Sequence, residues 1–157
     1  MESNPNPIHI LLADDDDDDR MFFQEALNEM AMTAILITVE DGEKLMDVLS
    51  TMDNPPPPHL IFLDINMPRK NGKECLEEIR GNKKFDNIPV IMFSTSTYRG
   101  DIDETYQKGA NLYIPKSLFY SDQKLILEKL FSKLWKEYLQ KVPREKFVLR
   151  KDLLKDI

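Results

Sequence analysis

Acidic and basic side chains stand directly after short apolar runs at three separated places in the sequence. These are Asp14 and Asp15 after Ile10–Ala13, Asp64 after Leu60–Leu63, and Lys116 after Leu112–Pro115. If the apolar runs are parallel strands that lie side by side, their carboxyl ends meet at one edge of the sheet. That edge then carries an acidic pocket with one ammonium group, which is suited to hold a divalent metal and to phosphorylate a carboxylate.

The acidic residues of this pocket offer the oxygen ligands that Mg²⁺ prefers. Because Mg²⁺ keeps several of its waters, a few protein carboxylates are enough. We predict that Asp15 and Asp64 are direct ligands, that Asp14 acts through a water, and that Asn66 contributes its backbone carbonyl. Without a cation the carboxylates would repel one another and raise each other's pKa, and a metal together with Lys116 removes that cost.

The same pocket has the groups that phosphoryl transfer needs, namely a positioned nucleophile and charges that neutralise the phosphoryl oxygens. We predict Asp64 as the nucleophile, which forms an acyl phosphate. Ser94 ends another apolar run and offers its hydroxyl to one phosphoryl oxygen, while Lys116 offers its ammonium group to a second.

Apolar and β-branched runs alternate with stretches of helical spacing along the chain. The runs predicted as strands are 8–13, 34–39, 60–64, 89–94 and 112–114. The last predicted helix has an apolar stripe made of Leu127, Leu130, Phe131, Leu134, Trp135 and Tyr138. This alternation predicts an α/β sandwich with a parallel sheet.

The composition limits the class of protein. The 157 residues suit one domain, with 41% hydrophobic and 31% charged residues, which is typical of a soluble globular chain. The net charge of -7 argues against non-specific binding to nucleic acid or to an anionic membrane. Cys75 is the one cysteine, so no intrachain disulfide forms, which fits a cytoplasmic protein. No signal peptide or membrane-spanning stretch is expected.

Four pieces of the sequence, in their order and spacing, resemble the receiver domain of two-component response regulators. They are Ile10–Asp15, Leu63–Pro68 with Gly72, Val90–Ser94 and Tyr113–Lys116. The resemblance covers residues 8–138 and implies a flavodoxin-like, doubly wound, five-stranded parallel sheet in the order 2-1-3-4-5 with five helices. It implies Mg²⁺-dependent phosphorylation of Asp64 by a sensor histidine kinase or phosphotransfer protein, and a resulting change in binding to an unidentified downstream protein.

The resemblance also assigns roles around the phosphorylated carboxylate. It implies a switch in which Tyr113 turns inward when the Ser94 hydroxyl moves to the phosphoryl group. It implies that Asn66 and Ser96 flank the route of the hydrolytic water and tune the lifetime of the phosphoryl group. The alternative for Tyr113 is a half-buried packing residue, which is the commoner role of an aromatic side chain on a strand.

One position departs from the family pattern. The family usually has proline after the lysine, joined by a cis bond, whereas here Ser117 follows Lys116 and Pro115 precedes it. A cis bond before a residue other than proline costs about 3 kcal/mol. Either the bond is trans and the loop before the last helix is rearranged, or the strain is retained.

The end of the chain reads as an extension of this domain. Residues 139–157 are predicted to form no separate domain, and the chain from Lys136 onward is net basic. Its apolar residues indicate an extension that packs somewhere, and they are Phe147, Val148, Leu149, Leu153 and Leu154. The extension and the Tyr98–Arg99 region are expected to contact a partner or a second copy, so a homodimer is one possibility.

Other interpretations of the same residues fit less well. Asp16 to Asp19 are expected only to cap and solvate the first helix. A haloacid-dehalogenase-like phosphatase needs an acid two residues after the nucleophile, where this chain has Asn66. A flavin carrier needs a hydroxyl- and glycine-rich loop where this chain has aspartates. A degenerate receiver that only docks is disfavoured by the complete acid, hydroxyl and lysine set. We therefore expect no enzyme activity beyond the protein's own phosphorylation and dephosphorylation.

Overall fold

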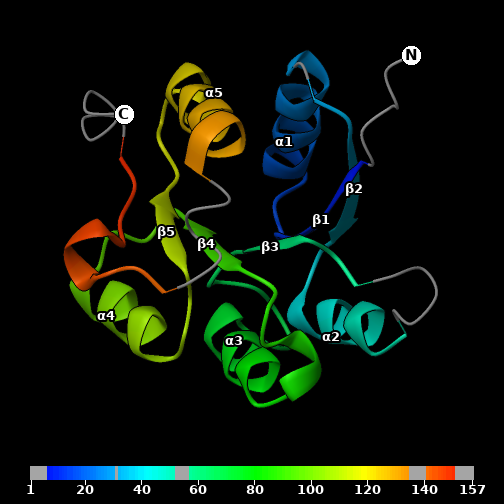
Figure 1. Ribbon diagram of the computed structural model, residues 1–157, viewed down its shortest axis with the longest axis vertical. Coiled ribbons are helices and arrows are strands. Elements are labelled where there is room, and N and C mark those ends of the chain that lie inside the picture. The colour runs from blue at the N-terminus through cyan, green and yellow to red at the C-terminus, as the bar shows by residue number, and fades with distance from the viewer. Residues whose placement is uncertain (1–6, 31, 52–56, 135–140, 151–157) are drawn as a thin grey trace.

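A parallel sheet runs through the middle of the computed structural model, which describes residues 7–30, 32–51, 57–134 and 141–150 (Figure 1). The strand order is β2-β1-β3-β4-β5. The strands are β1 (Ile8–Ala13), β2 (Ala34–Val39), β3 (Leu60–Leu63), β4 (Val90–Ser94) and β5 (Leu112–Pro115). The strand order and the parallel pairing confirm the predicted flavodoxin-like sheet.

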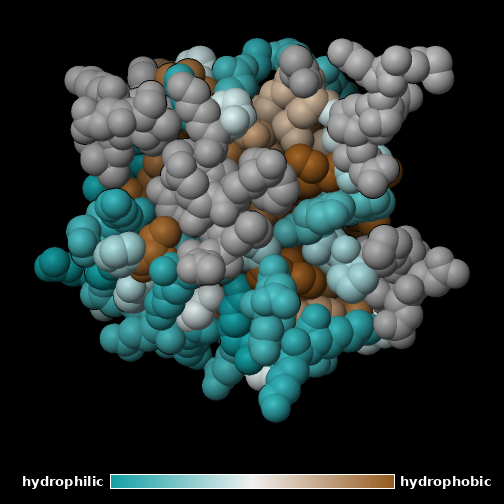
Figure 2. Space-filling view, viewed as in Figure 1, coloured by the Kyte–Doolittle hydropathy of each residue, from teal (hydrophilic) through white to brown (hydrophobic). Residues whose placement is uncertain are grey.

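Helices cover both faces of this sheet (Figure 1), and they are α1 (Asp17–Glu29), α2 (Gly42–Ser50), α3 (Gly72–Arg80), α4 (Arg99–Gln107) and α5 (Tyr120–Lys129). Helices α1 and α5 lie on one face, and α2, α3 and α4 lie on the other. Each face has its own apolar cluster between sheet and helices. The outer surface over α3 and α4 is mostly hydrophilic in Figure 2, as expected for helices that bury only one side.

The local sequence explains where these elements begin and end. Strands β3 and β4 are buried along their whole length, because helices cover both sides of a parallel sheet. Asp16 caps α1 by accepting from the backbone N–H groups of Asp18 and Asp19. Asn71 begins α3 with a reciprocal capping box. Gly109 follows α4 with a φ of 101°, a left-handed conformation that favours glycine.

The last helix differs from its predicted extent. Helix α5 ends at Lys129 and continues as a π-helical turn over Leu130–Leu134. Leu127, Leu130 and Phe131 of the predicted stripe are buried, whereas Trp135 and Tyr138 lie outside the described residues. Among the described helices, none is both long and apolar enough to cross a membrane.

Residues 141–150, which we call the strap, lie along the outer edge of β5 and beside α4 (orange to red in Figure 1). The strap contains a short 3₁₀ turn over Arg144–Lys146 and makes a parallel β-bridge between Val148 and Tyr113. Phe147 and Leu149 are buried, so the predicted packing of the extension is found for these residues. Leu153 and Leu154 lie outside the described residues.

Candidate functional site

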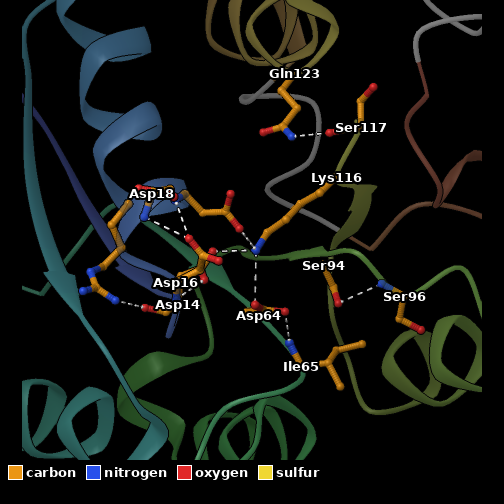
Figure 3. A network of polar contacts seen from close by, with 12 residues as sticks. Asp14, Asp16, Asp18, Asp64, Ile65, Ser94, Ser96, Lys116, Ser117 and Gln123 are labelled. Carbon is orange, nitrogen blue, oxygen red and sulfur yellow. Dashed lines mark hydrogen bonds and ion pairs between the residues drawn. The ribbon is translucent and has the colours of Figure 1, made fainter. Parts of the chain in front are cut away.

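Three strand ends meet at the carboxyl edge of the sheet around one lysine. Asp14 follows β1, Asp64 follows β3 and Lys116 follows β5. The Lys116 ammonium group donates to Asp14 Oδ2 at 2.7 Å and to Asp64 Oδ2 at 3.2 Å. Figure 3 shows Lys116 reaching across the sheet edge toward both carboxylates. Its side chain is only 3% exposed, so the contacts form away from bulk water.

The acidic side of this edge has the donor set of a divalent cation site. One carboxylate oxygen from each of Asp14, Asp15 and Asp64 lies within 4.8 Å of the others. Asp14 and Asp64 are buried, whereas Asp15 is exposed. Hard oxygen donors with one solvent-facing ligand fit Mg²⁺ or Mn²⁺, which keep some of their waters.

Burial and charge shift the proton affinities of this cluster. Burial raises the pKa of Asp14 from 3.8 to about 6, although its hydrogen bond with Lys116 acts in the opposite direction. Burial by itself lowers the pKa of Lys116, but Asp64, Asp14 and Asp19 outweigh it and hold that pKa above its ordinary value. The lysine is therefore charged at neutral pH. The total negative charge of the carboxylates around it is larger than its single positive charge.

The loop after β3 approaches the predicted phosphoacceptor, Asp64, closely. Asp64 Oδ1 accepts a hydrogen bond of 2.7 Å from the backbone N–H of Ile65. A Cβ on Gly72 would stand 2.1 Å from the Asp64 carbonyl oxygen, so only glycine permits this closure of the loop. Arg69 adopts a left-handed backbone conformation, with φ 69°, in the same loop. Asn66 is exposed, two residues after Asp64.

The hydroxyl side of the site is tied to the lysine through the backbone. Ser94 is buried at the end of β4, and its carbonyl accepts from the backbone N–H of Lys116 at 2.8 Å. Its hydroxyl oxygen accepts from the backbone N–H of Ser96 at 3.2 Å. The Tyr113 hydroxyl donates to the Ser96 carbonyl at 2.7 Å. Tyr113 is fully buried, not half-buried, and burial raises its pKa.

Asp19 belongs to the cluster, and the expectation that Asp16 to Asp19 only cap and solvate the first helix is wrong for this residue. Lys116 donates to Asp19 Oδ2 at 2.8 Å. Asp16 caps α1 as predicted, and Asp18 is exposed. No signal in the run of aspartates separates Asp19 from Asp18, because the direction of each side chain depends on where the helix begins.

The loop after Lys116, where the sequence departs from the family pattern, is held by hydrogen bonds. The Ser117 hydroxyl oxygen accepts from the backbone N–H of Phe119 at 3.1 Å. The Gln123 side chain on α5 donates to the Ser117 carbonyl at 2.6 Å (Figure 3). The loop is thereby fastened to α5 while Lys116 stays directed at the carboxylates.

Comparisons with known proteins agree with this arrangement. A family model described as the response regulator receiver domain matches residues 10–130. Response regulator Rcp1 from Synechocystis sp. is 39% identical over 119 residues, which cover 74% of this chain and 80% of Rcp1. A probable chemotaxis protein CheY from Rhizobium etli is 27% identical over 127 residues, which cover 81% of this chain and 95% of that protein.

Solved structures show the same likeness. The phosphorylated cyanobacterial phytochrome response regulator RcpA superposes with a TM-score of 0.75 at 35% identity, covering 80% of this chain and 93% of RcpA. The Mn²⁺-bound form of response regulator Rcp1 superposes with a TM-score of 0.75 at 33% identity, covering 87% of this chain and 98% of Rcp1. With its strand order, its four motif pieces and the family model in agreement, the chain belongs to the response regulator receiver domain family.

Proposed function

We propose that this protein is a phosphorylation-activated response regulator that accepts a phosphoryl group on Asp64 and then changes its binding to a downstream partner. The observation that carries the proposal is the contact of one buried ammonium group, on Lys116, with the carboxylates of Asp14 and Asp64. This contact supports the proposal, because a carboxylate that could act as a nucleophile, a cation and metal-type oxygen donors lie at one sheet edge.

In the proposed transfer, a carboxylate oxygen of Asp64 attacks the phosphorus of a phosphohistidine. The bond from phosphorus to the imidazole nitrogen breaks, the imidazole leaves with the electron pair, and an acyl phosphate remains on Asp64. Lys116 holds one phosphoryl oxygen through its ammonium group, and the Ser94 hydroxyl donates to another. Both residues reach the site from strand ends that a backbone hydrogen bond keeps together.

The metal in this scheme is Mg²⁺, which Asp15, Asp64 and the backbone carbonyl of Asn66 would hold directly and Asp14 would hold through a water. When bound, it neutralises the charge that builds up on the phosphoryl oxygens. The oxygen donor set within 4.8 Å supports this role. The similar protein Rcp1 has been solved in a Mn²⁺-bound form, which supports a divalent cation here.

The switch and lifetime roles are those that the resemblance to receiver domains implies, and we propose them here. Ser94 and Tyr113 are the proposed switch pair, because both are bonded to Ser96 in the connection between β4 and α4. Asn66 and Ser96 are the proposed lifetime-tuning pair. Asn66 is exposed and Ser96 is partly exposed, and this exposure supports the proposed lifetime role.

The proposed phosphodonor is a protein, a sensor histidine kinase or a phosphotransfer protein. Large apolar side chains are exposed on α1 and around the start of α5. They are Met21 (59%), Leu118 (97%), Phe119 (67%) and Tyr120 (50%). Phe22 stacks on Tyr120 with ring centroids 4.5 Å apart, so these two segments are neighbours. Such a patch suits contact with a protein surface.

We further propose residues 8–138 as the receiver unit, 139–157 as its extension, and the cytoplasm as its location.

Phosphorylation by a small-molecule donor tests the proposal. The full chain is incubated with Mg²⁺ and acetyl phosphate, and intact mass and peptide mapping locate the phosphoryl group. We expect one acid-labile phosphoryl group on Asp64, lost in Asp64→Asn and in the presence of a chelator. A modification that persists in Asp64→Asn, or none in wild type, contradicts the proposal. Repeated turnover of a phosphomonoester would instead favour the haloacid-dehalogenase-like reaction.

A further inference from the structure

Tyr113 is bonded to the strap on both sides of its backbone. Its N–H donates to the Phe147 carbonyl at 2.9 Å, and its carbonyl accepts from the N–H of Leu149 at 2.8 Å. Strand β5 is an edge strand of the sheet, so the strap satisfies backbone groups that would otherwise face water. The Leu149 amide hydrogen bond exists only while the strap is docked on β5.

Side chains fasten the strap to α4 as well. Phe147 is fully buried and packs against Tyr106 of α4, with ring centroids 5.0 Å apart. The Tyr106 hydroxyl donates to the Val142 carbonyl at 2.9 Å. Arg144 pairs with Asp103 of α4 at 2.8 Å. The strap therefore contacts both α4 and β5, the strand that contains the proposed switch residue Tyr113.

The other end of Tyr113 reaches the proposed phosphorylation site. Its hydroxyl holds the Ser96 carbonyl, and the Ser96 N–H holds the Ser94 hydroxyl oxygen. A continuous series of contacts thus joins Ser94 to the backbone of Phe147 and Leu149. The resemblance to receiver domains implies a tyrosine that turns inward on phosphorylation, whereas here Tyr113 is buried under the docked strap, with its ring 6.1 Å from that of Phe147.

We propose that docking of the strap and phosphoryl capture at Asp64 are positively coupled through Tyr113. The docked strap keeps the tyrosine inward, and the inward hydroxyl holds the connection that positions Ser94. When Asp64 is phosphorylated, the Ser94 hydroxyl donates to the phosphoryl group. This hydrogen bond in turn stabilises the connection and, through Tyr113, the strap. Coupling between two sites is reciprocal, so each event favours the other by the same factor. This inference rests on the proposed function of Asp64 and adds the extension of the chain to its switch.

Hydrogen exchange at one amide measures the coupling directly. The full chain is compared with and without Mg²⁺ and beryllofluoride, a mimic of the phosphoryl group, and binding of the mimic is followed separately by fluorine NMR. We expect the Leu149 amide to exchange about tenfold more slowly with the mimic bound, within the usual range of coupling between sites. An unchanged Leu149 rate with the mimic fully bound overturns the inference and leaves the proposed function standing.

Variants of the strap test the coupling in the opposite direction, from strap docking to binding at the Asp64 site. Phe147→Ala removes the buried ring, and we expect it to weaken beryllofluoride binding about tenfold. Lys146→Ala is the matched control, because Lys146 is exposed on the adjacent turn. We expect this variant to bind beryllofluoride with wild-type affinity. Tyr106→Phe removes only the hydrogen bond to Val142 and is expected to weaken binding about twofold, without the folding risk of a large cavity. Wild-type affinity in both Phe147→Ala and Tyr106→Phe overturns the inference.

Two further outcomes are informative. If wild type does not bind beryllofluoride at all, the proposed function fails and the inference fails with it. If protection of the Leu149 amide falls on dilution, the strap docks on a second copy and the coupling within one chain is wrong. Protection that is independent of protein concentration supports the intramolecular contact.

Discussion

Lys116 and Arg80 are cations near opposite ends of the sheet, and their partners differ in charge. Lys116, after β5, contacts the carboxylates of Asp14, Asp19 and Asp64. Arg80, at the end of α3, donates to neutral oxygens near the starts of β4 and β5. These are the carbonyls of Gly109, Phe85 and Ile88 and the side-chain oxygen of Asn111, at 2.8 to 3.1 Å.

This difference separates a structural cation, Arg80, from the proposed functional cation, Lys116. The Arg80 side chain is held without any ligand, because four neutral oxygens of the fold accept its hydrogen bonds. Burial lowers the pKa of Arg80, whereas the carboxylates raise that of Lys116 against the effect of burial. The Lys116 cluster retains excess negative charge, which a divalent cation relieves. Arg80 is therefore expected to affect stability alone, and Lys116 to affect stability, metal binding and phosphorylation together.

Replacement of the structural cation, Arg80, is expected to have the largest effect on stability. Arg80→Met keeps the stem of the side chain but leaves three backbone carbonyls without this donor. We expect a loss of about 4 kcal/mol in the free energy of unfolding, equal with and without Mg²⁺, measured by urea denaturation. Lys83→Met nearby is the control, because Lys83 is exposed, and it is expected to change stability by less than about 0.5 kcal/mol. A loss for Arg80→Met that depends on Mg²⁺ would remove the distinction between the two cations.

Mg²⁺ itself gives the next largest effect. A metal that binds only the folded state stabilises it by about 2.7 kcal/mol at a hundred times its dissociation constant. We expect this gain in thermal and chemical denaturation of wild type and its reduction in Asp15→Asn, which removes the exposed predicted ligand. Equal stabilisation of both proteins would place the metal elsewhere.

Replacement of Lys116, the proposed functional cation, tests whether this residue acts in phosphorylation as well as in stability. Lys116→Met leaves buried carboxylates without their cation, and we expect a loss of about 2 kcal/mol in metal-free protein. Saturating Mg²⁺ should recover much of this loss, because the metal supplies the missing positive charge. Phosphorylation by acetyl phosphate should fall strongly even at saturating Mg²⁺. A variant with wild-type phosphorylation would show that Lys116 acts only in structure.

The smallest expected effect concerns the additional carboxylate on α1. Asp19→Asn removes one competitor for the Lys116 ammonium group and one negative charge near the phosphodonor. We expect phosphorylation by acetyl phosphate to become about two- to fivefold faster, consistent with the modest energy of a partly exposed ion pair. Asp18→Asn, on the exposed side of the same turn, should change the rate by less than about twofold. Equal rates in the two variants would assign Asp19 no role at the site.

Local sequence predicted the strands and the residues at their ends, because an apolar run, its length and the next polar residue are adjacent in the chain. Parallel order then placed Asp14, Asp64 and Lys116 at one edge, as the structure has them. Contacts that depend on the direction of a side chain were harder to predict from the sequence. The contact of Asp19 depends on its direction around the first turn of α1, which a run of identical residues does not reveal.

Long-range packing accounts for what the sequence did not predict. Nothing near Arg80 indicates that its partners lie at Phe85, Ile88 and Gly109, since they come together only in the folded sheet. The apolar residues of the extension indicated packing, but not that Val148 would pair with Tyr113. Specific pairing of distant segments depends on the shape of the whole surface, and composition predicts only that apolar residues will be buried somewhere.

The most direct test of the metal and phosphoryl site is a two-step titration followed by amide NMR spectra of the full chain. Mg²⁺ is added first and beryllofluoride second. We expect Mg²⁺ to shift the signals of Asp14, Asp15, Asp64 and Asn66, and beryllofluoride then to shift those of Ser94, Ser96 and Lys116. Shifts confined to other parts of the protein, or beryllofluoride binding that leaves Lys116 and Ser94 unchanged, would contradict the convergence of these strand ends on one phosphoryl group.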